Sequence, residues 1–272
     1  MNKRAGFVFS SLAMLFVGIM QRAIGLVSIT VLARVLDPAG VGAYAFTQST
    51  SQTAYGMSRL GIDASLHTLL ARTDLKVDRR YAEVLIQQGA ALFLAVAGVG
   101  GIVLAALSEP IAHHLFAAPE LSTFVIIAAA LFVAQTLSHG AYVCYAGIHQ
   151  FVVFSRITIV TAAITVGVVS TGAVIGGPSG AAWGLAAGQS IAAMALVIGL
   201  VLALRADGII LMPRWPRRES IAILSLGLPF YTSGLLIFPA EFISLGAVSR
   251  FAGIDALGEL RVTLAMMAVA QI

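Results

Sequence analysis

The chain has 272 residues, of which 59% are hydrophobic and 10% are charged, and its mean hydropathy is +0.97. A soluble domain carries about 25% charged residues, so this composition excludes an ordinary soluble protein. The net charge of +4 sits in segments between apolar runs, where it sets membrane orientation, and we expect no nucleic-acid partner. The apolar runs lack the alternation of barrel strands, so the sequence predicts an all-α, polytopic integral membrane protein.

The first apolar run, residues 7–36, is long enough for a transmembrane helix and too long for a signal-peptide core. Gln21 and Arg22 interrupt its middle, and Arg22 lies about 22 Å along a helix that begins at Phe7. A charge at that depth costs roughly 3 kcal/mol or more, so it should face protein or a water-filled cavity. Two interpretations stay open: an arginine bonded to helix carbonyls, or a cation that lines a substrate cavity.

A second span is predicted at residues 41–62, followed by a basic loop at 67–80. This span carries a continuous polar stripe that lipid cannot satisfy, so the stripe should face the bundle. Its last two members, Arg59 and Asp63, are four residues apart and can pair. The stripe indicates either a cavity wall or polar contacts between helices. Its members are Tyr44, Gln48, Gln52, Tyr55, Arg59 and Asp63.

Further spans are predicted at residues 81–107, 121–145, 151–175 and 181–204, with a tight glycine-rich turn at 176–180. Residues 108–120 include two prolines and two histidines and predict a short interfacial helix. The fourth span places Gln135, Ser138, His139 and Tyr142 on one face. His139 is interpreted either as a packed, hydrogen-bonded side chain or as a proton relay. Three threonines share a side of the fifth span, where they can bond their own helix carbonyls and need no function.

The best domain boundary is a polar, arginine-rich linker at residues 206–218. We expect a six-helix N-lobe at 1–205, this cytoplasmic linker, and the start of a second lobe at 219–272. A seventh span at 220–248 contains Pro229, Pro239 and Glu241, and an eighth begins near Gly258. Eleven Lys and Arg residues fall on the side of the N-terminus against three on the other side, which predicts a cytoplasmic N-terminus.

Residues 33–43 and 249–259 suggest an internal repeat with an offset of 216. Arg34 and Gly42 in the first block correspond to Arg250 and Gly258 in the second. Each block joins an odd-numbered span to the next, so the repeat predicts two parallel six-helix lobes with a cavity between them. The second lobe would then lack about four helices, which predicts a fragment or a truncated form.

Four short blocks carry a resemblance to a known family. They are Leu32–Tyr44, Arg59–Ala64, Gly227–Phe230 and the segment from Glu241 to Gly258. Together they resemble the helix ends of Wzx-type (O-antigen) polysaccharide flippases. The chain departs from the family where many members carry Asp in place of Glu241 and Tyr in place of Glu259-Leu260.

The resemblance implies the fold of the multidrug/oligosaccharidyl-lipid/polysaccharide (MOP) exporters. It also implies movement of a polyprenyl-pyrophosphate-linked oligosaccharide across the cytoplasmic (inner) membrane by alternating access, for cell-surface polysaccharide biosynthesis. By similarity to lipid II flippases, which carry an arginine in a related first-helix element, Arg22 and less surely Arg59 would contact the pyrophosphate. Guanidinium suits phosphate because it bonds bidentately. The candidate cavity residues are Arg22, Arg59, Gln21, Gln48 and Gln52, and the candidate coupling or gating residues are Glu241, Asp63 and His139.

No P-loop, serine elbow or metal-ligand spacing is present in the sequence, and Cys144 is the one cysteine. We therefore expect a transporter and not an enzyme, with no metal or cofactor and with energy from an ion gradient or the membrane potential. Expected partners are the lipid-linked oligosaccharide, membrane lipids, and a polysaccharide polymerase and chain-length regulator of the same pathway. The alternatives are a drug/cation or lipid II exporter of the same superfamily, a membrane polysaccharide polymerase or acyltransferase, and an inactive fragment.

Overall fold

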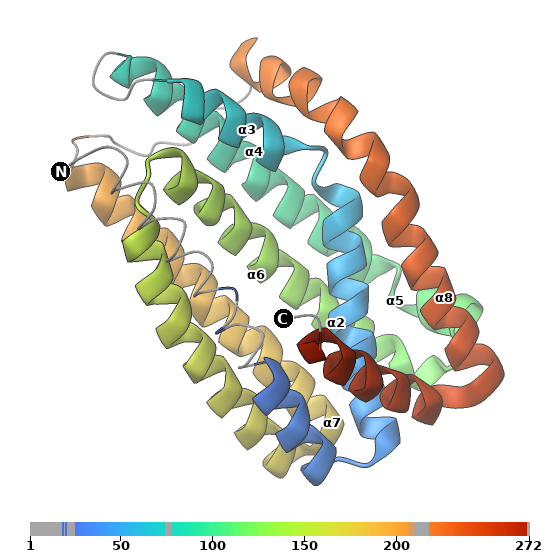
Figure 1. The fold of residues 1–272 in the computed structure, drawn as a ribbon. Helices are drawn as coiled ribbons and strands as arrows, with labels where there is room; N and C mark the ends of the chain where they lie inside the picture. The colour runs from blue at the N-terminus through green and yellow to red at the C-terminus, as the bar shows by residue number, and fades with distance from the viewer. Residues whose placement is uncertain are drawn as a thin grey trace.

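The computed structural model describes residues 18, 20, 25–73, 78–206, 208 and 218–270, with the side chains of 218, 233–238, 241, 261, 264–266 and 268–270 excepted. Every regular element in these ranges is helical (Figure 1). Three helical segments are long and apolar enough to cross a membrane: Arg79–Ala106, Pro119–Gly147 and Phe151–Ala206. The prediction of an all-α, polytopic membrane bundle is confirmed.

The helices follow one another with short connections. A helix at Gly25–Val35 precedes α2 (Pro38–Ser58), α3 (Ile62–Arg72) and α4 (Arg79–Ala106). The predicted short helix at 108–120 is a set of single turns: α5 (Ser108–Pro110), the π-helical η1 (Ile111–Leu115) and the 3₁₀-helical η2 (Pro119–Leu121). Three long helices complete the described chain: α6 (Ser122–Gly147), α7 (Phe151–Ala206) and α8 (Arg218–Ala270).

Helix α7 is a hairpin of two antiparallel helices. The chain reverses at Gly177, whose φ of 59° lies in the left-handed region that favours glycine. The two halves pack closely, since a methyl group on Gly184 would lie 2.8 Å from the carbonyl oxygen of Val168. A methyl group on Gly188 would lie 2.8 Å from the Thr165 side chain. The predicted spans at 151–175 and 181–204 and their turn are confirmed.

The prediction of one span at 41–62 and a loop at 67–80 is wrong in its boundaries. Helix α2 ends at Ser58, because Leu60 (φ 49°) and Gly61 (φ 69°) take the left-handed conformation. The chain then forms α3, which occupies the first half of the predicted loop. Leu66 and Leu70, one turn apart, are both buried, so the apolar face of α3 holds it against the bundle.

The sequence Asp37-Pro38-Ala39-Gly40 has the features of a helix start, and α2 begins there. The Asp37 carboxylate accepts a hydrogen bond from the Gly40 backbone N–H at 2.7 Å, which caps the helix. Pro38 occupies the first helical position, where its missing N–H costs nothing. A methyl group on Gly40 would lie 2.8 Å from both the Asp37 carboxylate and the Pro178 ring. These four residues therefore fix where α2 begins.

Helix α6 is the centre of the bundle and contacts α2, α3, α4 and α7 (Figure 1). Tyr145 of α6 is fully buried and its hydroxyl donates to the Leu196 carbonyl of α7 at 3.1 Å. Near the opposite end of the helix, Phe46 and Phe116 pack edge to face with ring centroids 4.6 Å apart. The first contact joins α6 to α7, and the second joins α2 to the segment that precedes α6.

Helix α8 lies against α2 and also contacts α3 and α4 (Figure 1). The helix breaks at Gly253, whose φ is 87°. Asp37, the residue between the first two helices, lies 216 positions before Gly253. The two equivalent positions in the predicted repeat therefore both separate a pair of helices.

The contact between α2 and α8 is reciprocal with respect to this offset of 216. A methyl group on Gly42 would meet the Ile254 carbonyl oxygen and would lie 2.9 Å from the Ile254 side chain. Conversely, a methyl group on Gly258 would meet the Pro38 carbonyl oxygen and would lie 3.0 Å from the Gly42 nitrogen. Gly42 corresponds to Gly258 and Pro38 to Ile254, so equivalent residues exchange equivalent contacts, as they would about a two-fold axis.

Candidate functional site

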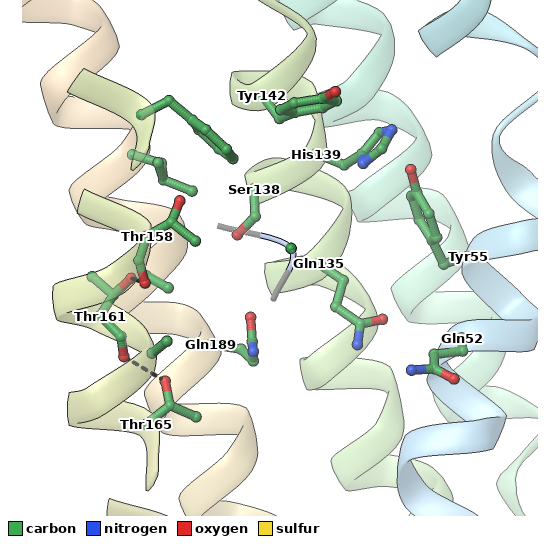
Figure 2. Close-up of a pocket in the computed structure, with 15 residues that line it drawn as sticks. Gln52, Tyr55, Gln135, Ser138, His139, Tyr142, Thr158, Thr161, Thr165 and Gln189 are labelled. Atoms are coloured by element: carbon green, nitrogen blue, oxygen red, sulfur yellow. Dashed lines mark hydrogen bonds between the residues drawn. The ribbon is translucent and has the colours of Figure 1, made fainter. Parts of the chain in front are cut away.

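A polar cavity of about 660 Å³ opens between α2, α6 and the two halves of α7 (Figure 2). Gly18 also borders it. Most of the wall is made of amides, hydroxyls and aromatic rings within an otherwise apolar bundle. The other lining residues are Gln52, Tyr55, Gln135, Ser138, His139, Tyr142, Phe154, Thr158, Thr161, Ala162, Thr165, Gln189, Ala192 and Leu196.

Helix α6 contributes one wall of the cavity. The residues of this wall, Gln135, Ser138, His139 and Tyr142, are those that the sequence predicts to share one face of the helix. Positions three and four apart lie on one side of a helix, and Figure 2 shows that side turned toward the cavity. The Gln135 side-chain oxygen accepts a hydrogen bond from Ser51 of α2 at 2.8 Å. That bond fixes the orientation of the amide, so its nitrogen is the free end for further bonds.

The wall from α7 comes from the three threonines and from Gln189. Thr161 and Thr165 donate to helix carbonyls four residues back, at 2.8 and 2.9 Å, as the sequence predicts. Thr158 does not: its hydroxyl is buried and has no hydrogen-bond partner. The Ser138 hydroxyl, which projects from α6 toward the same space, is also buried without a partner (Figure 2).

A charged cluster lies beside the cavity, where α2 gives way to α3. The Arg59 guanidinium is 3.1 Å from the Asp63 carboxylate, so the predicted pairing of these residues is confirmed. His139 of α6 places Nε2 3.4 Å from the same carboxylate oxygen. The Arg59 guanidinium also stacks over the Tyr55 ring at 5.4 Å. The cluster therefore links α2, α3 and α6.

Helix α3, with 11 residues, is too short to span the membrane. Burial raises the pKa of Asp63, but the hydrogen bond with His139 and the charge of Arg59 outweigh it, so this pKa lies below its ordinary value. The carboxylate is thus held in its charged form. Within the described ranges, no group of three His, Cys, Asp or Glu residues is arranged to hold a metal ion.

The candidate site residues fall into three groups. Gln52 and His139 line the cavity, and Arg59 and Asp63 form the cluster beside it. Gln48 lies one turn before Gln52, half-buried, and does not line the cavity. Gln21, Arg22 and the side chain of Glu241 lie outside the described residues.

Gln189 and the threonines are the lining residues that sequence reasoning missed. The threonine spacing was a signal, but bonds within the helix explained it equally well. Gln189 gives no such pattern, because it is the one amide in an apolar stretch of the helix, with only Ser190 as a polar neighbour in sequence. That isolation is itself a usable signal, since an amide costs free energy in lipid and should face a cavity or a neighbour.

Replacing Asp63 with asparagine should lower the free energy of unfolding by about 1 kcal/mol. The amide keeps the shape of the carboxylate but removes the ion pair with Arg59 and weakens the contact with His139. Thermal unfolding in detergent measures the change, and a double-mutant cycle with Arg59→Gln isolates the pair. Asp78→Asn is the matched control, because Asp78 is exposed and its side chain makes no capping bond. Equal stability of the Asp63 and Asp78 variants would contradict the prediction.

The family of polysaccharide biosynthesis proteins matches residues 8–272 of the chain. The chain belongs to this family. It is the family of Wzx-type flippases in the MOP superfamily, so the resemblance inferred from the sequence is confirmed. No curated protein and no solved structure matches the chain.

In this Wzx-family chain, the blocks that carry the family resemblance meet in pairs. Residues 38–42 of the first block contact residues 254–258, as described above. Gly61, in the block Arg59–Ala64, packs on Gly227, the first residue of the block Gly227–Phe230. A methyl group on Gly61 would lie 2.7 Å from the Gly227 Cα, and one on Gly227 would lie 2.6 Å from the Gly61 carbonyl oxygen. Family motifs therefore lie where α8 touches the first helices.

Proposed function

We propose that this protein moves a polyprenyl-pyrophosphate-linked oligosaccharide across the cytoplasmic membrane by alternating access, with its N-terminus in the cytoplasm. The family, whose members are typically flippases, supports a transporter in polysaccharide biosynthesis. The excess of Lys and Arg on the N-terminal side supports the orientation. We also propose that the protein is a transporter without enzymatic activity.

The observation that carries the proposal is the polar cavity between α2, α6 and α7. A stripe of amides and hydroxyls on helices this apolar would be unfavourable against lipid, so the cavity provides its polar environment. Its volume of about 660 Å³ is within the range of small-molecule sites, which is about 300 to 1,000 Å³. A solute with many hydroxyls could therefore enter the membrane interior there.

Arg22 is proposed as the pyrophosphate contact. Gly18 borders the cavity, and Arg22 follows it by four residues, one turn of a helix. Arg59 is a weaker candidate because Asp63 already neutralises it. Glu241, Asp63 and His139 are proposed to gate the cavity or couple transport to a cation gradient.

The rival drug or cation exporter would need a carboxylate available to a cation. Asp63 is bonded to both Arg59 and His139, so the described cluster does not offer one. A polymerase or acyltransferase would need a catalytic group of titratable residues. His139 lines the cavity, but its Nε2 lies 3.4 Å from the Asp63 carboxylate, and the nearby Ser138 hydroxyl makes no hydrogen bond to it, so the two do not form a nucleophile–base pair.

The test is transport by purified protein in liposomes that carry a labelled lipid-linked oligosaccharide. A glycosidase added outside the liposomes cleaves only the substrate in the outer leaflet. Transport brings substrate from the inner leaflet to the outer one, so the cleaved fraction should rise toward completeness. Arg22→Gln should slow this rise by roughly tenfold or more, the effect of losing one charge-assisted contact. Protein-free liposomes are the control. Efflux of a cationic dye without movement of the oligosaccharide would support the exporter instead.

A further inference from the structure

A second cavity, of about 390 Å³, lies where α2 begins and where α8 breaks. Three segments that are far apart in the sequence line it: the start of α2 at Ala39, the turn between η1 and η2, and the part of α8 around Gly253. We call it the junction cavity. Its volume is within the range of small-molecule sites, and none of its lining residues also lines the polar cavity between α2, α6 and α7.

The junction cavity carries charges of both signs. Glu120 and Asp255 supply two carboxylates, and Arg250 supplies a guanidinium. None of these three side chains forms an ion pair with another residue that the structure describes. The carboxylates would repel a simple anion, and the guanidinium would repel a metal ion. The cavity therefore best fits a ligand that carries a cation and an anion together.

A buried hydroxyl in the same wall lacks a partner. Ser249 is 5% exposed, lines the junction cavity, and makes no side-chain hydrogen bond within the described protein. A buried hydroxyl without a partner is unfavourable, so it indicates that a ligand completes the site. Ser249 and Arg250 are adjacent and both line the cavity, so they offer a hydroxyl and a guanidinium as donors. These are donors that a phosphate group accepts.

The junction cavity lies at one end of the membrane-length helices. The segment Pro119–Gly147, which is long and apolar enough to cross a membrane, begins one residue before Glu120. Ala39 is beside Gly40, which approaches Pro178 at the turn of the α7 hairpin. The ends of membrane-spanning helices lie at the level of the lipid headgroups. A lipid bound here would therefore place its headgroup in the cavity.

An exposed apolar surface of α8 adjoins the junction cavity. Phe251 follows Arg250 and is 88% exposed, and Ile243 is 58% exposed. Residues eight apart lie on the same face of a helix, so these two side chains form a strip that leads away from the cavity along α8. Acyl chains can lie along such a strip while the headgroup occupies the polar cavity. A small water-soluble zwitterion would leave the strip unused.

We infer that the junction cavity binds the headgroup of a zwitterionic phospholipid that has a primary ammonium group, as in phosphatidylethanolamine. Arg250 and Ser249 donate hydrogen bonds to the phosphate, and Glu120 and Asp255 accept them from the ammonium group. The bound lipid joins α2, the turn between η1 and η2, and α8. This site is separate from the transported substrate, and the inference does not depend on the proposed function.

The test is native mass spectrometry of the purified, delipidated protein, which gives a dissociation constant for each added lipid. The probes are dioleoyl phosphatidylethanolamine, dioleoyl phosphatidylcholine and dioleoyl phosphatidylglycerol. The first should bind about tenfold more tightly than the other two, the effect of one charge-assisted hydrogen bond. The trimethylated ammonium of phosphatidylcholine has no hydrogen to donate, and phosphatidylglycerol has no cation. Equal binding of the three lipids would overturn the inference.

Three variants make the test residue-specific. Glu120→Gln and Asp255→Asn should each weaken phosphatidylethanolamine binding about threefold to tenfold and weaken phosphatidylcholine binding less. Arg250→Gln should weaken the binding of all three lipids, because each has a phosphate. All three side chains are exposed, so the variants should fold. An unchanged preference for phosphatidylethanolamine in both carboxylate variants would contradict the inference.

Glu109→Gln and Arg34→Gln are the matched controls. Both side chains are exposed and do not line the junction cavity, and Arg34 corresponds to Arg250 at the offset of 216. Neither substitution should change lipid binding.

Two soluble competitors test the class of ligand. Phosphoethanolamine, which is the headgroup without acyl chains, should displace the lipid only weakly, and Mg²⁺ should not displace it. Displacement by phosphoethanolamine at the concentration at which the lipid binds would assign the cavity to a water-soluble zwitterion. Displacement by Mg²⁺ would assign it to a metal ion. Either result would overturn the inference.

Discussion

Replacing Gly61 with alanine should destabilise the folded protein by roughly 3 kcal/mol or more, which for a membrane protein of this size should sharply reduce the yield of folded material. Two costs combine. The φ of 69° is unfavourable for any residue with a Cβ. The added methyl group would also collide with the Gly227 backbone, 2.7 Å from its Cα, and no side-chain rotation can relieve a collision with backbone.

Gly177→Ala separates the two costs. Gly177 has a φ of 59°, but a methyl group there meets nothing within 4 Å. This variant should therefore show the conformational cost alone, about 1 to 2 kcal/mol. Thermal unfolding in detergent measures both variants. If Gly61→Ala proves no worse than Gly177→Ala, then the close approach of α8 to Gly61 is not present in the native protein.

Alanine at Gly42 or at Gly258 should each cost roughly 1 to 3 kcal/mol, because either methyl group forces α2 and α8 apart. The losses of stability caused by the two substitutions should not be additive. Since both substitutions separate the same two helices, the double variant should lose less stability than the two single variants together. Unfolding of the four proteins in the cycle measures this coupling.

The matched control for this cycle is Gly98→Ala, in α4. A methyl group on Gly98 meets nothing within 4 Å, so alanine should stabilise the helix by about 0.5 to 1 kcal/mol. Strict additivity of the substitutions at Gly42 and Gly258 would contradict a shared contact. It would also remove the structural support for an offset of 216 between equivalent positions.

Much of the membrane architecture followed from the sequence alone. The long apolar runs within residues 79–206 predict membrane-length helices, because length and composition are local properties. The turn at Gly177 and the break at Gly253 were also predictable, since glycine-containing segments ended each run. The face of Gln135, Ser138, His139 and Tyr142 followed from helical spacing.

The break at Leu60 and Gly61 was not predicted, because the polar stripe continues through it at helical spacing. Its cause is tertiary: the apolar face of α3 packs against α6, and Gly227 of α8 lies on Gly61. Such contacts between distant segments decide the break, because a single glycine such as Gly61 weakens a helix by only about 1 kcal/mol and does not by itself end it.

In the candidate site, too, some features can be predicted from the sequence and others are decided only by the tertiary structure. The sequence alone marked Gln52, Arg59, Asp63 and His139 as polar residues that lipid cannot accommodate, and it predicted the pairing of Arg59 with Asp63. It could not distinguish a threonine that bonds its own helix from one that does not. Thr158 and Thr161 lie three residues apart on one helix, yet Thr161 bonds a carbonyl and Thr158 does not. Only the tertiary structure shows that difference, because hydrogen bonding depends on side-chain orientation and neighbours that spacing does not encode.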